Sequence, residues 1–263
     1  MWALLGRLCR HVPRPATHHW RLPTNLFSVS QSFTPLSKLP NFDPQKVAVT
    51  AVDAHLPAVG NRHLQPEALR QRFLAPPVWT PEFNEEGRYA DRPRMRASVL
   101  VPIVMRSEPT VLLTERTAHL STHSGQIAFP GGKADEGDAN EAATALREAQ
   151  EEVGLDAHFV DVLGHLSVYT TGSSFVITPV VALVRPDFVL TPNAFEVADV
   201  FEVPLAFLMN PANHRHHIVE HDGRQREWLS MPYLDPGTDP ARQRFIWGAT
   251  AGMLRNFYRF LSA

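Results

Sequence analysis

The stretch Arg147-Glu148-Ala149-Gln150-Glu151-Glu152-Val153-Gly154-Leu155 decides how the rest of the chain is interpreted. On a helix, Glu148, Glu151 and Glu152 fall at i, i+3 and i+4, so their carboxylates share one face. The opposite stripe is apolar, and Gly154 ends the helix. Carboxylates this close repel one another, and their oxygens suit Mg²⁺ or Mn²⁺. The stretch therefore predicts an acidic face that either holds a divalent metal or is a solvated surface.

The residues in front of this helix favour the metal. Pro130-Gly131-Gly132 stops a short predicted strand, and a tight turn there brings backbone carbonyls and amides near the acidic face. Asp138, with Glu141 three residues later, predicts the N-cap of the helix. Arg147 adjoins the carboxylates and can pair with them.

Strands and helices are intermixed along the rest of the chain. We expect strands at 98–105, 110–114, 126–129, 159–169 and 175–184, and helices at 66–73, 205–209 and 246–261. The segment 217–231 predicts a hairpin turned at Asp222-Gly223, and residues 185–204 are expected to be a loop. This order predicts the α/β class, with a mixed β-sheet packed between helices.

The composition excludes several classes of protein. The chain has 263 residues, 44% of them apolar, with 25 Lys and Arg against 27 Asp and Glu, which is typical of a folded globular protein. Near neutrality argues against a general nucleic-acid binder, and the apolar runs are too short to span a membrane. The single cysteine, Cys9, cannot pair within the chain and favours a reducing compartment. We therefore expect a small-molecule partner, with no nucleic acid and no membrane.

The first 42 residues differ from the rest because they contain no Asp or Glu. That composition is typical of an organelle transit peptide, but Pro13, Pro15 and Pro23 would interrupt its helix. A disordered or non-native leader is the favoured alternative, so the cytoplasm is the expected location and organelle targeting stays open. We expect an irregular lead-in at 43–94 and the functional domain at 95–263.

The acidic stretch resembles the signature of the Nudix hydrolases. That family carries a glycine, a spaced acidic residue, then Arg-Glu, two further residues, Glu-Glu, any residue, Gly and an apolar residue. The second half matches in full. Counted from Gly132, Arg147 comes one residue later than the general spacing, and Asp138 stands roughly where a Glu is usual.

The preceding stretch is similar to one branch of that family, the coenzyme A diphosphatases. The matching residues are Leu112-Leu113-Thr114-Glu115-Arg116-Thr117, Leu120, His123, Gly125-Gln126-Ile127-Ala128-Phe129-Pro130-Gly131-Gly132, Asp135 and Asp138. Thr117 replaces a Ser and keeps a hydroxyl, whereas Glu115 stands where a basic residue is common. The resemblance covers about residues 112–155.

The resemblance implies a Nudix α/β/α sandwich that hydrolyses a diphosphate bond with Mg²⁺ or Mn²⁺. The substrate it implies is coenzyme A or a thioester, and the products are 4′-phosphopantetheine, or its acyl form, and adenosine 3′,5′-bisphosphate. It leaves open whether free, acylated or oxidised coenzyme A is preferred.

The resemblance also implies roles for individual residues. Glu148, Glu151 and Glu152 would be metal ligands, and Gly132 would offer a backbone carbonyl. Catalysis would fall to Glu148, Arg147 and Glu152, with Glu148 either a ligand or the general base and Arg147 holding the carboxylates. The residues expected to contact the substrate are Arg116, His123, Gln126, Gly131 and Gly132.

Two other functions remain as alternatives. One is a broader nucleoside-diphosphate hydrolase, such as an ADP-ribose diphosphatase. The other is a catalytically silent Nudix module that senses a nucleotide, although the complete set of acidic residues argues for turnover.

Three further features each have more than one interpretation. Glu196 is a base, a fourth carboxylate ligand or the cap of a turn. The histidines His214, His216, His217 and His221 suggest a zinc site, but an exposed hairpin explains them better because strand alternation separates neighbours. The aromatic residues Trp228, Trp247, Phe257 and Tyr258 are an adenine-stacking surface or, more commonly, core or dimer contacts. A homodimer through the apolar C-terminal helix is open.

Overall fold

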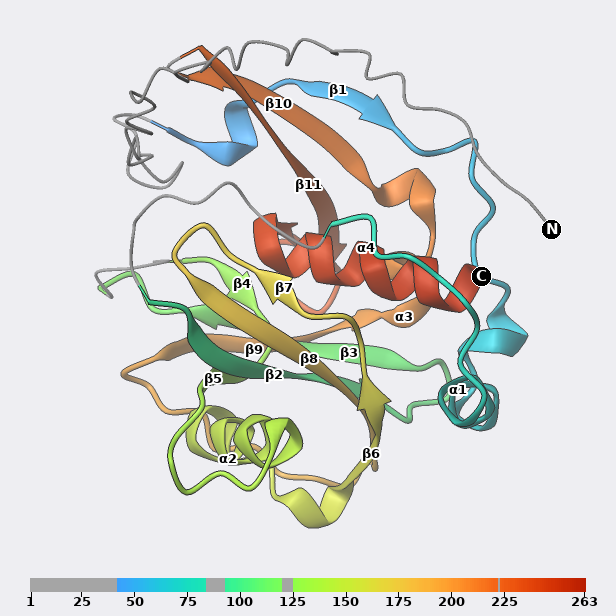
Figure 1. Cartoon of the computed structure of the whole chain (residues 1–263), viewed down its shortest axis with the longest axis vertical. Coiled ribbons are helices and arrows are strands. Elements are labelled where there is room, and N and C mark those ends of the chain that lie inside the picture. The colour runs from blue at the N-terminus through green and yellow to red at the C-terminus, as the bar shows by residue number, and fades with distance from the viewer. Residues whose placement is uncertain (1–41, 84–92, 120–124, 222) are drawn as a thin grey trace, which may run out of the picture. The chain divides into compact units, whose positions relative to one another are not determined.

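The structure is a computed structural model that describes residues 42–83, 93–119, 125–221 and 223–263. Predictions that fall on His123, Leu120, Asp222 and residues 1–41 therefore lie outside the described residues. Within the described part, the chain forms two β-sheets with helices packed on and between them (Figure 1).

The larger sheet is mixed, because its two longest strands run parallel and the other pairs are antiparallel. The parallel strands are β2 (Met95–Val104) and β8 (Phe175–Val184), paired along their whole length. The other strands of this sheet are β3 (Thr110–Arg116), β4 (Ile127–Ala128), β5 (Gly131–Lys133), β6 (Val160–His165), β7 (Tyr169–Thr170) and β9 (Val197–Pro204). The prediction of a mixed sheet between helices is confirmed.

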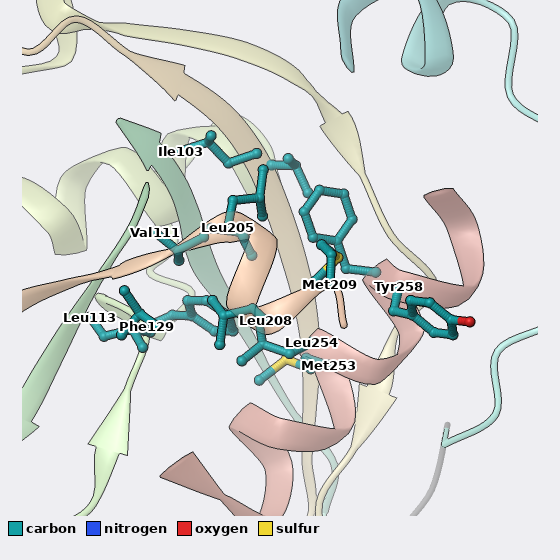
Figure 2. Close-up of a cluster of buried hydrophobic side chains, with 14 of the residues drawn as sticks. Ile103, Val111, Leu113, Phe129, Leu205, Leu208, Met209, Met253, Leu254 and Tyr258 are labelled. Carbon is teal, nitrogen blue, oxygen red and sulfur yellow. The ribbon is translucent and has the colours of Figure 1, made fainter. Parts of the chain in front are cut away.

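Both faces of the larger sheet are buried, which explains why its central strands are continuously apolar. Alternate residues point to opposite faces. One face packs on α2 (Glu141–Val153) through Leu100, Val104, Leu112, Val180 and Ala182. The other face packs toward α4 (Gly248–Ser262) through Val99, Val101, Ile103, Val111, Leu113, Val181 and Leu183. Figure 2 shows part of this second core, where Leu205, Leu208 and Met209 lie between residues of β2 and β3 and residues of α4.

The smaller sheet lies on the far side of α4 from the larger one (Figure 1). Its four antiparallel strands are β1 (Val49–Val52), β10 (Arg215–His221), β11 (Arg224–Asp235) and β12 (Arg242–Trp247), in the order β1-β10-β11-β12. Leu229, Met231 and Ile246 point from it into the core shared with α4. The helix is therefore buried between two sheets on most sides, and the buried residues include Arg255 and Asn256.

The remaining helical segments are short. They are α1 (Pro66–Leu74), α3 (Leu205–Leu208) and the 3₁₀ turns η2 (Pro44–Lys46), η3 (Asn61–Leu64), η4 (Ala157–Phe159) and η5 (Pro211–Asn213). Phe73 of α1 packs against Phe260 of α4, with ring centroids 4.8 Å apart. No helix in the described ranges is long and apolar enough to cross a membrane.

Four strands were not predicted. One of them is β5, which pairs with β2 at residues where a tight turn was expected. Residues 197–204, expected to be loop, form β9, which pairs with β3; Asp199 and Glu202 disguise its apolar alternation. Residues 242–247 form β12, so the last helix begins at Gly248 and not at 246. The lead-in contributes β1, whose residues are all exposed and whose strand geometry comes from pairing with β10.

The cap of α2 was also predicted wrongly. Asn140, not Asp138, is the N-cap, and its Oδ1 accepts a hydrogen bond from the Ala143 amide at 2.9 Å. The predicted end is confirmed, because Gly154 adopts the left-handed conformation with φ 71°. Asp138 is thereby released for a different partner in the site.

Candidate active site

Arg147 is the centre of the acidic face of α2. Its Nε and Nη2 donate to the two carboxylate oxygens of Asp138, each at 3.0 Å. Its Nη1 donates to Glu148 at 2.9 Å and to Glu151 at 3.1 Å. The hydrogen bonds from Arg147 hold the pKa of Asp138 well below its usual range, and those to Asp138 raise the pKa of Arg147. One guanidinium thus orients three carboxylates, and Asp138 is its bidentate partner, a role that the sequence did not reveal.

The glycine turn lies directly against this face. Arg147 Nη2 donates to the Lys133 carbonyl at 3.0 Å, which joins the turn to the helix. A Cβ placed on Gly132 would lie 2.5 Å from Glu148 Cδ, and one on Gly131 would lie 2.5 Å from the Ser98 carbonyl oxygen. Only glycine permits this approach, so the pair sets the distance between the turn and the carboxylates.

Glu152 is buried, although the spacing alone suggested a solvated face. Its side chain is 7% exposed, accepts a hydrogen bond from the Gly131 amide at 3.1 Å and lies 3.8 Å from Arg116 Nη1. Burial raises the pKa of Glu152 to about 7, with Glu148 and Glu196 adding to the effect and Gly131 and Arg116 opposing it. The helix contacts the sheet over this residue, which the i, i+3, i+4 pattern could not show.

The other two carboxylates have different surroundings. Burial raises the pKa of Glu148 despite the ion pair with Arg147, because the side chain is mostly covered. Glu151 is more than half exposed. The three acids predicted as ligands therefore share one face but differ in burial.

Arg116 comes to the site from β3. Its Nε is buried and has no hydrogen-bond partner among the described residues, while Nη1 faces Glu152. Its amide donates to the Gln126 carbonyl at 3.0 Å, which places these two predicted substrate residues side by side. The Gly131 amide, also predicted to meet substrate, holds Glu152 instead.

A tight turn at residues 193–197 brings Glu196 to the same site. The Asn193 amide donates to the Glu152 carbonyl at 2.8 Å, and the Thr117 amide donates to the Glu196 carbonyl at 3.0 Å. Asn193 Oδ1, not Glu196, makes the capping bond of this turn, to the Phe195 amide at 3.1 Å. The charge of Glu196 raises the pKa of both Glu148 and Glu152, so it lies within electrostatic reach of them.

The side chains fit a hard divalent cation in kind. In the described part of the chain, no group of three or more His, Cys, Asp or Glu side chains is gathered closely enough to hold a metal ion. The donors on offer are nevertheless all oxygens: Glu148, Glu151, Glu152 and the backbone carbonyl of Gly132. Because Gly132 has no Cβ, the space between its backbone and the Glu148 carboxylate stays open, and a Cβ at this position would fill it. This set matches the preference of Mg²⁺ and Mn²⁺.

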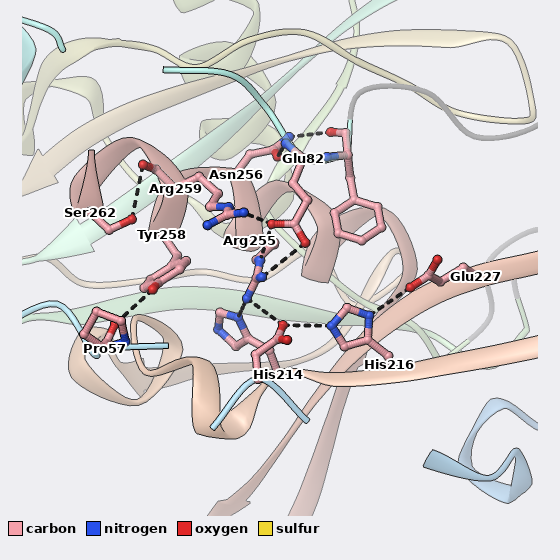
Figure 3. A network of polar contacts seen from close by, with 12 residues as sticks. Pro57, Glu82, His214, His216, Glu227, Arg255, Asn256, Tyr258, Arg259 and Ser262 are labelled. Atoms are coloured by element: carbon pink, nitrogen blue, oxygen red, sulfur yellow. Dashed lines mark hydrogen bonds and ion pairs between the residues drawn. The ribbon is translucent and has the colours of Figure 1, made fainter. Parts of the chain in front are cut away.

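The predicted histidine cluster is not a shared site. His214 accepts a hydrogen bond from Arg255 Nη1 at 3.0 Å (Figure 3). It donates to the Leu208 carbonyl at 2.8 Å. His216 lies between Asp53 and Glu227, and His217 stacks on Trp228. The prediction of an exposed hairpin is also wrong for His214 and His217, because the strands pack against α4 and residues 47–53.

The aromatic residues singled out from the sequence divide between the core and the smaller sheet. Phe257 and Tyr258 are buried in α4, as their second interpretation expected. Trp228 is buried in β11, whereas Trp247, at the end of β12, is partly exposed.

Comparison with known proteins identifies the family. A family model described as the NUDIX domain matches residues 94–231, a span that contains the glycine turn, α2 and Arg116. The chain belongs to the Nudix family. NudL of Yersinia pestis, named an uncharacterized Nudix hydrolase, is 40% identical to this Nudix hydrolase over 177 residues, which cover 67% of this chain and 84% of NudL. NudL of Yersinia pseudotuberculosis has the same identity and coverage.

Solved structures are similar at lower levels. The Ap4A hydrolase of C. elegans is 20% identical, covers 45% of this chain and 85% of its own, and has a TM-score of 0.37. The Nudix hydrolase RenU of M. smegmatis is 24% identical, with 48% and 81% coverage and a TM-score of 0.38. As a Nudix hydrolase, this chain is an enzyme of a family that acts on small nucleoside diphosphate derivatives and generally uses divalent metals such as Mg²⁺ or Mn²⁺.

Proposed function

We propose that this Nudix hydrolase cleaves the diphosphate bond of coenzyme A or its thioesters. The products would be 4′-phosphopantetheine, or its acyl form, and adenosine 3′,5′-bisphosphate. The observation that carries the proposal is Arg116, which comes from the segment similar to coenzyme A diphosphatases. Its guanidinium faces buried Glu152 and keeps one buried N–H without a partner in the described structure. An arginine in that state suits a phosphate oxygen as its missing acceptor.

The carboxylates of α2 would hold the cation. Glu148, Glu151 and Glu152, with the Gly132 carbonyl, are the proposed ligands for Mg²⁺ or Mn²⁺. When bound, the cation neutralises the charge of the diphosphate and lowers the pKa of a bound water. Arg147 is a positioning residue, because its bonds to Asp138, Glu148 and Glu151 orient the ligands.

The proton of the attacking water needs an acceptor. Glu148 is the first candidate, because it lies against the glycine turn and burial raises its pKa. Glu196 is the second candidate, since the rigid turn at 193–197 presents it to the same carboxylates. Arg116 and Gln126 would bind the phosphate oxygens, and His123 belongs to the same proposed substrate contacts.

A side-by-side hydrolysis assay tests the proposal. The full-length protein is incubated with coenzyme A, ADP-ribose or a dinucleoside polyphosphate, with and without Mg²⁺ or Mn²⁺, and products are identified by mass. We expect metal-dependent release of 4′-phosphopantetheine, with coenzyme A clearly preferred. Faster cleavage of ADP-ribose would replace the substrate and keep the chemistry. Nucleotide binding without cleavage of any substrate would identify a sensor.

A further inference from the structure

A cavity of about 320 Å³ lies where the smaller sheet meets the β3–β4 hairpin. The aromatic side chains Phe42, Phe245 and Trp247 line it together with Gln243 and Arg242 of β12. Glu115 and Ile127 close it from the hairpin. The volume is near the lower end of the range of small-ligand sites. The lining combines three aromatic side chains with the polar side chains of Gln45, Glu115, Gln126, Arg242 and Gln243.

The aromatic wall is built by strand alternation. Gln243, Phe245 and Trp247 are alternate residues of β12, so they share the face opposite Arg244 and Ile246, which are buried. Phe42 packs on this face, with its ring centroid 6.2 Å from Trp247 and 5.8 Å from Trp228. Phe245 and Trp247 remain partly exposed. Flat aromatic surface left open beside amide groups favours a planar heteroaromatic ligand.

The cavity adjoins the acidic site through the hairpin. Arg116 of β3 points toward Glu152 on one face of the sheet, and the preceding residue, Glu115, points to the other face, where the cavity lies. On β4, Ile127 pairs with Glu115 and lines the cavity, and Gln126 comes directly before it. The acidic site and the cavity therefore lie on opposite faces of the same pair of strands, β3 and β4.

The guanidinium of Arg242 places a positive charge at the cavity wall. Arg242 Nη2 binds Glu115 at 2.5 Å, and Arg244 neutralises the same carboxylate from behind at 3.0 Å. Arg242 Nη1 is 3.9 Å from the nearest Asp199 oxygen, which is longer than a hydrogen bond, and half of the side chain is exposed. This guanidinium can therefore bind an anionic group and still keep its ion pair with Glu115.

We propose that the cavity binds the adenine ring of the substrate, with Trp247 and Phe245 stacking on the base and Arg242 meeting the phosphate of the ribose. The inference rests on the proposed function in taking the substrate to be an adenosine 3′,5′-bisphosphate derivative. The glutamine amides at the wall offer both donors and acceptors to the edge of the base. The pantetheine arm has no planar ring, so it makes poorer use of this aromatic wall.

The test is equilibrium binding of adenosine 3′,5′-bisphosphate to the full-length protein by calorimetry, without metal. Gln243→Trp fills the cavity from an exposed strand position and should weaken binding by about tenfold or more, as expected when a base loses its stacking site. Gln225→Trp is the matched control, because Gln225 is an exposed glutamine on β11 of the same sheet and does not line the cavity.

A second pair removes the stacking surface instead of filling the space. Trp247→Leu should weaken binding by a similar factor, whereas Trp79→Leu, which removes a partly buried tryptophan packed on Phe260, should not. Melting temperatures of all four variants identify any that fail to fold, and Gln243→Trp removes no buried contact. Unchanged binding in folded Gln243→Trp would overturn the inference.

Turnover separates this inference from the proposed function. If the wild type hydrolyses coenzyme A, Gln243→Trp should raise KM for coenzyme A and leave kcat nearly unchanged. If the wild type does not hydrolyse coenzyme A but binds the bisphosphate and loses it in Gln243→Trp, the function is wrong and the adenine site stands. If Gln243→Trp instead loses binding of 4′-phosphopantetheine and keeps binding of the bisphosphate, the adenine site is wrong and the cavity binds the other half of the substrate.

Discussion

Two arginine-centred clusters of this protein have opposite charge balances. Around Arg147 on α2, six carboxylates gather near only two arginines: Asp135, Asp138, Glu148, Glu151, Glu152 and Glu196 against Arg116 and Arg147. Around Arg255 on α4, Asp53 and Glu82 meet Arg255 and Arg259 one for one (Figure 3). Arg255 is only 2% exposed, whereas the side chain of Arg147 is 26% exposed.

The difference in charge balance distinguishes the two roles: the Arg147 cluster is suited to bind a cation, and the Arg255 cluster stabilises the fold. Arg255 bonds Asp53 and Glu82, two parts of the N-terminal segment, to the last helix, and Asn256 accepts the amides of Glu82 and Phe83. Every buried charge there has its partner. At Arg147 the acids outnumber the arginines, and the charges of Glu148 and Glu196 add to the burial that raises the pKa of Glu152. A divalent cation would supply the missing charge.

The largest expected effect is on turnover in the Arg147 cluster. Glu152→Gln should lower kcat on the order of a thousandfold or more, because it removes a charged oxygen at the proposed cation site. The fold should survive, since a neutral amide is easier to bury than a carboxylate. Hydrolysis assays measure kcat, and denaturation in urea measures the stability of the fold. If Glu152→Gln is as active as the wild type, Glu152 is not part of the cation site.

The stability of that variant also has a pH dependence. The folded-state pKa of Glu152 is about 7, above the usual value of a glutamate, so ionisation opposes folding as the pH rises through that range. The metal-free Glu152→Gln variant should therefore gain stability relative to the wild type above pH 7 and show no such gain below pH 4.

The next effect is on stability in the Arg255 cluster. Arg255→Met should lower the free energy of unfolding by about 3–5 kcal/mol, because Asp53 and Glu82 lose their buried partner. Arg185→Met, at an exposed pair with Asp187, is the control and should change little. Specific activity of the folded variant should match the wild type, and a loss of activity at full stability would contradict a purely structural role.

A smaller effect should appear on acidification. Burial lowers the pKa of His214 to about 4, so the unfolded chain takes up this proton first as the pH falls. Stability from neutral His214 is complete above about pH 6.5 and is lost as the pH falls toward 4, by at most about 3 kcal/mol. Denaturation curves give the free energy of unfolding at pH 7.5 and at pH 5. The difference between these two values should be smaller in His214→Gln than in the wild type or in the control His55→Gln, whose histidine is exposed.

The smallest effect should follow from loss of the positioning residue. Arg147→Ala should lower activity by about 10–100-fold, because the ligands lose their orientation. It should also lower the free energy of unfolding by about 1 kcal/mol, since its ion pairs are partly exposed. A variant with full activity would show that the bonds from Arg147 to Asp138, Glu148 and Glu151 do not order the site.

Local sequence patterns predicted a large part of this structure. The Arg-Glu-x-x-Glu-Glu spacing predicted the acidic helix, and the apolar run at 175–184 predicted β8 at its observed bounds. The glycines predicted the close approach of the backbone to the helix, although they form β5 and not a turn. These are short-range properties, since helical and strand periodicity act within a few residues. The similarity over residues 112–155 likewise led to the Nudix family.

Only the tertiary structure decided the features that depend on distant partners. β1 and β12 are strands because β10 and β11 offer them hydrogen bonds, and Asp138 serves Arg147 because Asn140 takes the cap. Glu152 is buried because α2 lies on the sheet beneath Gly131. Spacing determined which carboxylates share a face, but burial and charge pairing, which set their pKa values, arise only when separate segments pack together.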